Sequence, residues 1–166
     1  MKEQHSYCSY CGQRYQPDQP WPRYCVACGN TSYLNPLPVA VVLQPVDEGL
    51  LLIRRGIDPH KGRLALPGGF IAIDETWQEA GARELHEETG LIIDPRNIQE
   101  FQVRSAEDGT LLIFGLAAPT ASRDLPEFVP TVEAAERIVV RHPPARMAFR
   151  LHQEAVAEYF SRGKLT

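Results

Sequence analysis

The chain has 166 residues, of which 43% are hydrophobic, so its length predicts one soluble globular domain with at most a small appendage. Its formal net charge of -4 argues against a general polyanion binder, because counterion-release binding to nucleic acid requires a basic face. No apolar stretch approaches the roughly 20 residues of a membrane span, and the N-terminus has no secretory hydrophobic region, so we expect a cytoplasmic protein without a membrane partner.

The N-terminal segment 1–34 contains all four cysteines and almost no periodic aliphatic residues, so we expect it to form its own unit. Cys8 and Cys11 enclose two residues, Cys25 and Cys28 enclose two more, and thirteen residues separate the pairs. Two such pairs can present four thiolates tetrahedrally, as Zn²⁺ favours in closed structural sites without an open catalytic position. We therefore expect a zinc ribbon whose folding depends on the metal, the alternatives being a redox dithiol and an iron–sulfur cluster.

Six aromatic side chains in this unit could instead stack on nucleic-acid bases. They are Tyr7, Tyr10, Tyr15, Trp21, Tyr24 and Tyr33. The charged residues of the unit sum to only +1, which is too little for a surface that follows phosphates. We therefore interpret the rings as a small core around the metal and do not expect a nucleic-acid partner.

Two buried strands are predicted next, because continuous apolar runs occupy 37–43 and 50–55 on either side of a turn at 45–49. The following segment 56–70 is rich in turn-forming residues and is expected to be a loop, with or without a short strand, leading to an acidic segment.

The acidic segment 74–88 holds six carboxylates and one arginine, a local net charge of -5, while the rest of the chain sums to +1. Thr76 as N-cap, Glu79 three residues later as its capping-box partner and Gly90 as the stop together predict a helix. Trp77 lies nearly in line with the glutamates, so we do not expect it in the core.

Further strands are predicted at 97–105 and 109–119, around a turn from Ala106 to Gly109, and at 135–141. A proline-bearing surface stretch precedes the last of these strands. An amphipathic helix over 145–160 closes the chain, so the intermixed strands and helices predict an α/β or α+β domain with a mixed sheet.

Three carboxylates of the acidic helix, Glu84, Glu87 and Glu88, share one face, where each like-charge pair costs roughly 0.2–0.5 kcal/mol. A solvated helix face normally interleaves lysines, but here Arg83 is the only cation, spaced to pair with Glu79 or Glu87. A hard divalent cation held by carboxylate oxygens would convert this repulsion into coordination.

The spacing of the segment is also specific: Gly69, five residues, Glu75, seven residues, and then the run from Arg83 to Leu91. It resembles the Nudix box, GX5EX7REUXEEXGU with U aliphatic, at every fixed position. The resemblance extends over roughly 37–160, and the cysteine unit is similar to that of NADH pyrophosphatase-type Nudix enzymes. We therefore expect a zinc ribbon at 1–34 and a Nudix domain at 35–166.

The resemblance implies an α/β/α sandwich and Mg²⁺- or Mn²⁺-dependent hydrolysis of a nucleoside diphosphate linked to another moiety. By position, Glu84, Glu87 and Glu88 would hold the metal with the Gly68 carbonyl. Arg83 and Glu75 would orient this cluster.

A later acidic residue often joins the cluster in this family, and the candidates here are Glu133 and Glu136. One carboxylate, Glu84, Glu133 or Glu136, would accept the proton of the attacking water, and which of them does so stays open. Four basic residues upstream of the box could contact phosphates, although a solvated basic loop is an equal alternative. They are Arg54, Arg55, Lys61 and Arg63.

The substrate is left open, because the SQPWPFPxS-like motif typical of NADH pyrophosphatases is missing after the box. NADH, FAD and ADP-ribose all contain the diphosphate on which the box would act. The alternative to an enzyme is a noncatalytic nucleotide sensor or regulator with the same fold. We expect a small nucleotide as the ligand, and the sequence leaves a homodimer open.

Overall fold

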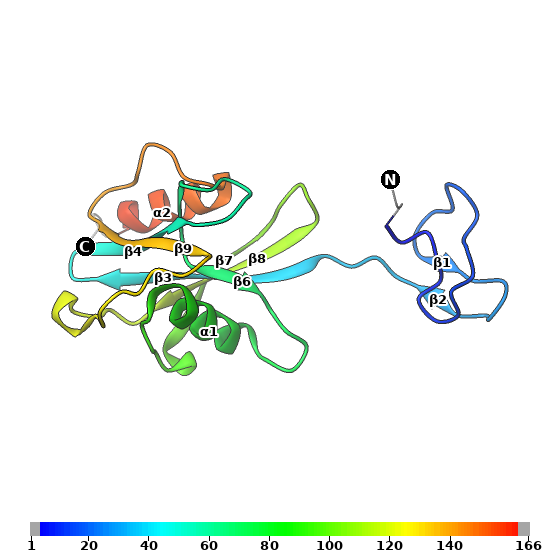
Figure 1. Cartoon of the computed structure of the whole chain (residues 1–166), viewed down its shortest axis with the longest axis horizontal. Helices are drawn as coiled ribbons and strands as arrows, with labels where there is room; N and C mark the ends of the chain where they lie inside the picture. Colours follow the sequence, from blue (N-terminus) through cyan, green and yellow to red (C-terminus); the bar gives the residue numbers. More distant parts are fainter. Residues whose placement is uncertain (1–3, 163–166) are drawn as a thin grey trace. The chain divides into compact units, whose positions relative to one another are not determined.

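The computed structural model describes residues 4–162, and the chain divides into two compact units between Pro36 and Leu37 (Figure 1). No helix among the described residues is long and apolar enough to cross a membrane. The smaller unit contains one antiparallel pair of short strands, β1 (Arg23–Tyr24) and β2 (Thr31–Ser32).

The interpretation that the aromatic rings of the smaller unit form a core is wrong for most of them. Tyr15 is buried between Cys8 and Cys25, and its hydroxyl donates to Ser32 Oγ at 2.7 Å. Four other tyrosines are each at least 55% exposed: Tyr7, Tyr10, Tyr24 and Tyr33. Two strands of two residues cannot cover six rings, so two cysteines, Cys8 and Cys25, fill the available interior with Tyr15.

The larger unit is built on a mixed sheet whose central strands run in the order β5-β4-β3-β8-β7, with β6 added to β3 and β9 to β4. Its strands are β3 (Leu37–Val46), β4 (Gly49–Arg55), β5 (Leu64–Ala65), β6 (Gly68–Phe70), β7 (Ile98–Ser105), β8 (Thr110–Ala117) and β9 (Ala134–Val140). The β3 and β8 strands are parallel, and the other pairs are antiparallel.

Two helices, α1 (Trp77–Thr89) and α2 (Arg150–Arg162), lie on opposite faces of this sheet (Figure 1). Two short 3-10 helices, η1 (Pro95–Asn97) and η2 (Ser122–Asp124), lie in the connections. The mixed sheet between two helical layers confirms the predicted α/β/α sandwich.

The two faces of β3 explain why its sequence is continuously apolar rather than alternating. Val41 and Leu43 pack into a core cluster with α2, whereas Val42 packs into a second cluster with Leu85 of α1. Both faces of the strand are therefore covered, as the apolar run predicts.

Two sequence-based expectations are wrong in this unit. Trp77 packs against the core cluster on the α1 side of the sheet. Its ring also lies close to β8, since a Cβ on Gly115 would be 2.9 Å from Trp77 Cζ3. Its position at the first turn of the helix lets the large ring reach β8. The closing helix begins at Arg150 rather than near 145, because Ala148 N–H is bound to Leu64 O at 2.7 Å and is not available to a helix.

Candidate active site

The ends of α1 are fixed by the residues that the sequence predicts. The Thr76 side chain accepts from Glu79 N–H, the Glu79 carboxylate accepts from Thr76 N–H, and Gly90 ends the helix with φ 77°. The helix lies close to the sheet, since a Cβ on Gly81 would be 3.0 Å from Val42 Cγ2. The small side of the helix therefore sets the position of its carboxylates against β3 and β6.

The three glutamates of α1 have different environments. Glu84 and Glu88 are buried, with 8% and 5% exposure, whereas the Glu87 side chain is 56% exposed. Burial raises the pKa of Glu88 to about 8, although Gly68 N–H donates to its Oε2 at 2.9 Å. Burial also raises the pKa of Glu84. Two neighbouring buried carboxylates are therefore short of positive charge.

The backbone of Gly68 and Gly69 lies directly against these two carboxylates. A Cβ on Gly69 would meet Glu84 Oε1 at 2.4 Å, so any larger residue there would push the carboxylate away. The bond from Gly68 N–H to Glu88 brings the Gly68 backbone to the same place. Oxygen donors and excess negative charge fit a hard divalent cation.

Arg83 is the cation that organises the cluster. It donates to both carboxylate oxygens of Glu75, at 2.6 and 3.1 Å, and to Glu84 Oε1 at 2.7 Å. A weaker contact of 3.4 Å reaches Glu87 Oε2, while Glu79 is occupied in the helix cap. The bidentate contact with Arg83 lowers the pKa of Glu75 to about 2.

The two later acidic candidates are placed differently. The Glu133 carboxylate is close enough to raise the pKa of both Glu84 and Glu88. Glu136 instead accepts from Arg54 Nε at 2.7 Å on the β4–β9 ladder. Among the described residues, Glu133 is therefore the candidate that joins the cluster.

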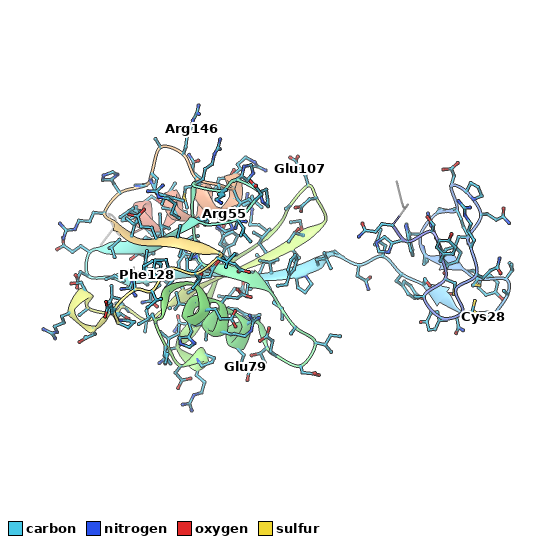
Figure 2. The ribbon with its side chains drawn as sticks, in the orientation of Figure 1. Cys28, Arg55, Glu79, Glu107, Phe128 and Arg146 are labelled. Carbon is cyan, nitrogen blue, oxygen red and sulfur yellow. The ribbon has the colours of Figure 1, made fainter. Side chains whose placement is uncertain are left out.

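Of the four basic candidates, Arg55 alone lines the cavity that begins at Gly68 and Gly69. Its Nε donates to Pro59 O at 2.8 Å, and its guanidinium lies 5.0 Å from the centre of the Phe149 ring. Figure 2 labels Arg55 near α2, whereas Glu79 lies at α1. Arg54 is held by Glu136, and the other two basic candidates, Lys61 and Arg63, are not among the lining residues.

The cavity has a volume of about 530 Å³ and was not predicted from the sequence. Its floor comes from β3 and β8, and one wall comes from Phe149 and the first turn of α2, including His152. A histidine inside an amphipathic helix pattern gives no local signal that it will line a cavity, because the other walls are distant in the sequence.

The four cysteines form a separate cluster in the smaller unit, with all four sulfur atoms within 4.8 Å of one another. The Sγ atoms of Cys8 and Cys28 are 3.7 Å apart, as are those of Cys11 and Cys25. Four sulfurs at about 2.3 Å from a tetrahedral zinc would be about 3.8 Å apart, so the arrangement fits this metal.

The relation to known proteins agrees with this geometry. A family model described as the NUDIX domain matches residues 34–147. A solved NUDIX hydrolase from Nitrosomonas europaea shares 25% identity with a TM-score of 0.79, over 96% of this chain and 93% of that one.

Two curated relatives match shorter segments. An ADP-ribose pyrophosphatase from Methanocaldococcus jannaschii is 48% identical over 60 residues, which are 36% of each chain. An NAD-capped RNA hydrolase NudC from Edwardsiella ictaluri is 33% identical over 91 residues, 54% of this chain and 35% of that protein. The matched segments therefore span only slightly more than a third of these relatives.

Proposed function

Because the chain belongs to the Nudix family, we propose that it hydrolyses the diphosphate of a nucleoside diphosphate linked to another moiety, such as NADH, FAD or ADP-ribose. The observation that carries this proposal is the pair of buried carboxylates, Glu84 and Glu88, held against the backbone of Gly68 and Gly69. Buried carboxylates without enough positive charge are costly unless they bind a cation or a proton. The names of the two curated relatives support the same class of bond.

The proposed ligands of the divalent metal, Mg²⁺ or Mn²⁺, are Glu84, Glu87, Glu88 and the Gly68 carbonyl. When bound, such a metal neutralises phosphate oxygens and acidifies water. Arg83 keeps Glu84 in one orientation through its 2.7 Å contact and is itself fixed by Glu75. The absence of a side chain at Gly69 keeps the space open for the Glu84 carboxylate.

The proton of the attacking water needs an acceptor, for which we favour Glu133. Glu84 is engaged by Arg83, and Glu136 is engaged by Arg54. Among residues 4–162, Glu133 forms no ion pair, so its carboxylate is free to accept. Arg55, at the edge of the cavity, is the proposed contact for a phosphate of the substrate.

The first 34 residues form, in this proposal, a structural zinc ribbon attached to a hydrolase domain at 35–166. The fit of the four sulfur positions to a zinc tetrahedron supports this assignment. Four thiolates leave no open coordination position, so the ribbon would not carry out the hydrolysis itself.

The test is a panel of NADH, NAD, FAD, ADP-ribose and nucleoside triphosphates with Mg²⁺ or Mn²⁺, scored by the phosphate products. We expect AMP from at least one dinucleotide. Glu88→Gln should abolish cleavage, while the matched exposed variant Glu48→Gln should retain it. If no compound is cleaved and Glu88→Gln binds nucleotide as the wild type does, the chain is a nucleotide sensor and the enzymatic proposal is wrong.

A further inference from the structure

The cavity beside the carboxylate cluster is divided into a charged edge and an apolar interior. Gly68 and Gly69 line the cavity next to the carboxylates, and its charged lining residues are Arg55, Glu107, Asp108 and Arg150. The interior is formed by one face of the sheet, because Val39 pairs with Leu112 in the β3–β8 register and both line the cavity. Leu66 and Leu151 complete the apolar lining.

His152 is the buried polar side chain of this interior, with 6% of its surface exposed. It lies in the first turn of α2, where its Nδ1 is 3.2 Å from Leu66 N. A backbone N–H can only donate, so Nδ1 is the acceptor and carries no hydrogen. The neutral imidazole then carries its hydrogen on Nε2.

The surroundings keep this ring neutral. Burial and the nearby charge of Arg55 lower the pKa of His152 to about 3. Its ring neighbours are Phe114 and Phe149, whose centres lie 5.7 and 5.0 Å away. Among residues 4–162, Nε2–H has no protein acceptor, and Nε2 is not one of the fully buried unpartnered side-chain atoms, so this donor is accessible from the cavity that His152 lines.

The chemistry of the lining selects the kind of group that fits the interior. A phosphate placed against these apolar side chains would lose its hydration, which is costly, whereas Arg55 supplies positive charge for a phosphate at the edge. A neutral planar ring with one hydrogen-bond acceptor would bury well and satisfy the histidine donor. Phe70, 62% exposed and also lining the cavity next to Gly69, offers an aromatic face beside the phosphate end.

We propose that the interior of this cavity binds the base of the nucleotide, and that His152 Nε2–H donates to a ring nitrogen of that base. The assignment rests on the proposed function in that the ligand is taken to be a nucleotide. It makes His152 a residue that determines base specificity, at a site separate from the metal-binding carboxylates.

The experiment measures binding of AMP and its 1-deaza, 3-deaza and 7-deaza analogues by calorimetry in the presence of Mg²⁺. AMP has no diphosphate bond, so binding is separated from cleavage. Each analogue replaces one ring nitrogen by C–H and so removes one acceptor. We expect one of the three to bind the wild type about tenfold more weakly than AMP, as for the loss of one hydrogen bond.

Two variants separate the acceptor function of His152 Nδ1 from the donor function of its Nε2–H. In His152→Asn the amide oxygen can replace Nδ1 as the acceptor for Leu66 N–H, but the Nε2–H donor is lost. In His152→Gln the amide nitrogen can replace the Nε2 donor. We expect His152→Asn to bind AMP and all three analogues with equal affinity, and His152→Gln to keep part of the discrimination. The exposed His142→Asn is the matched control and should behave as the wild type.

The assignment is overturned if AMP does not bind, if the wild type binds all four compounds equally, or if His152→Asn keeps the discrimination. Cleavage of ADP-ribose by the wild type is measured in parallel. A protein that discriminates among the analogues but cleaves nothing would refute the hydrolase and leave the base site intact. A protein that cleaves ADP-ribose but does not discriminate among the analogues would refute the base site and leave the hydrolase proposal intact.

Discussion

Glu88→Gln is expected to stabilise the metal-free protein while it abolishes the proposed activity. Burial raises the pKa of Glu88 from 4.5 to about 8, so between these values the folded state binds more protons than the unfolded state. Stability from this group is fully present below pH 4.5 and is lost as the pH rises through 8. A shift of this size corresponds to roughly 3 kcal/mol at pH 7.

Glutamine removes this penalty, because its neutral side-chain oxygen can still accept from Gly68 N–H without requiring a proton. The measurement is the free energy of unfolding by urea at pH 7 to 9 without added Mg²⁺ or Mn²⁺. The helical circular dichroism signal reports on the larger unit, since α1 and α2 both belong to it. A chelator is avoided because it would also remove zinc.

Glu87→Gln is the matched control, because this neighbouring side chain is 56% exposed and its replacement should change stability by less than about 0.5 kcal/mol. Adding Mg²⁺ should stabilise the wild type and not Glu88→Gln, since only the wild type keeps the full set of proposed ligands. If Glu88→Gln is less stable than the wild type at pH 8 without metal, the buried carboxylate is not short of positive charge and the reasoning fails.

Three other outcomes are expected. Elemental analysis should find about one zinc per chain, and Cys28→Ser should lower that content; a folded ribbon without metal would refute the assignment. Gly69→Ala should reduce the rate of AMP release about a hundredfold, because the Cβ of the new alanine would lie 2.4 Å from Glu84 Oε1. An unchanged rate would show that the Glu84 carboxylate can move away without loss of activity. On acidification from pH 6.5 toward 3, the free energy of unfolding of the wild type should fall by about 1.4 kcal/mol per pH unit relative to that of His152→Asn. The reason is that the unfolded chain protonates this histidine at a higher pH than the folded chain does. Parallel stability curves for the two proteins would contradict the low pKa of His152.

Signals from residues close together in the sequence made α1 and most strands predictable. The capping box of Thr76 and Glu79 and the stop at Gly90 depend on neighbours within a few residues, so the sequence contains the whole signal. The turn at 106–109 is equally local, with Gly109 at φ 86°.

Long-range contacts explain what could not be predicted. Helical periodicity places Glu84, Glu87 and Glu88 on one face, but only the position of β6 decides that two of them are buried and the third is not. In the sequence, His152 is one polar residue of an amphipathic helix. Its hydrogen bond with the backbone of Leu66, 86 positions away, is visible only in the structure. The tyrosines of the smaller unit were misjudged because an aromatic composition does not show how little interior two short strands provide.

The separation of the α1 carboxylates from the cavity lining has a consequence for how substrate range can change. The carboxylates come from α1, whereas His152 comes from α2 on the other face of the sheet, and Phe149 immediately precedes α2 (Figure 1). On the proposed assignments, substitutions at the start of α2 would alter which base is accepted without touching the proposed metal ligands or Arg83. On the same assignments, a family member would acquire a new nucleotide by changes in this wall while the bond that it cleaves stayed the same.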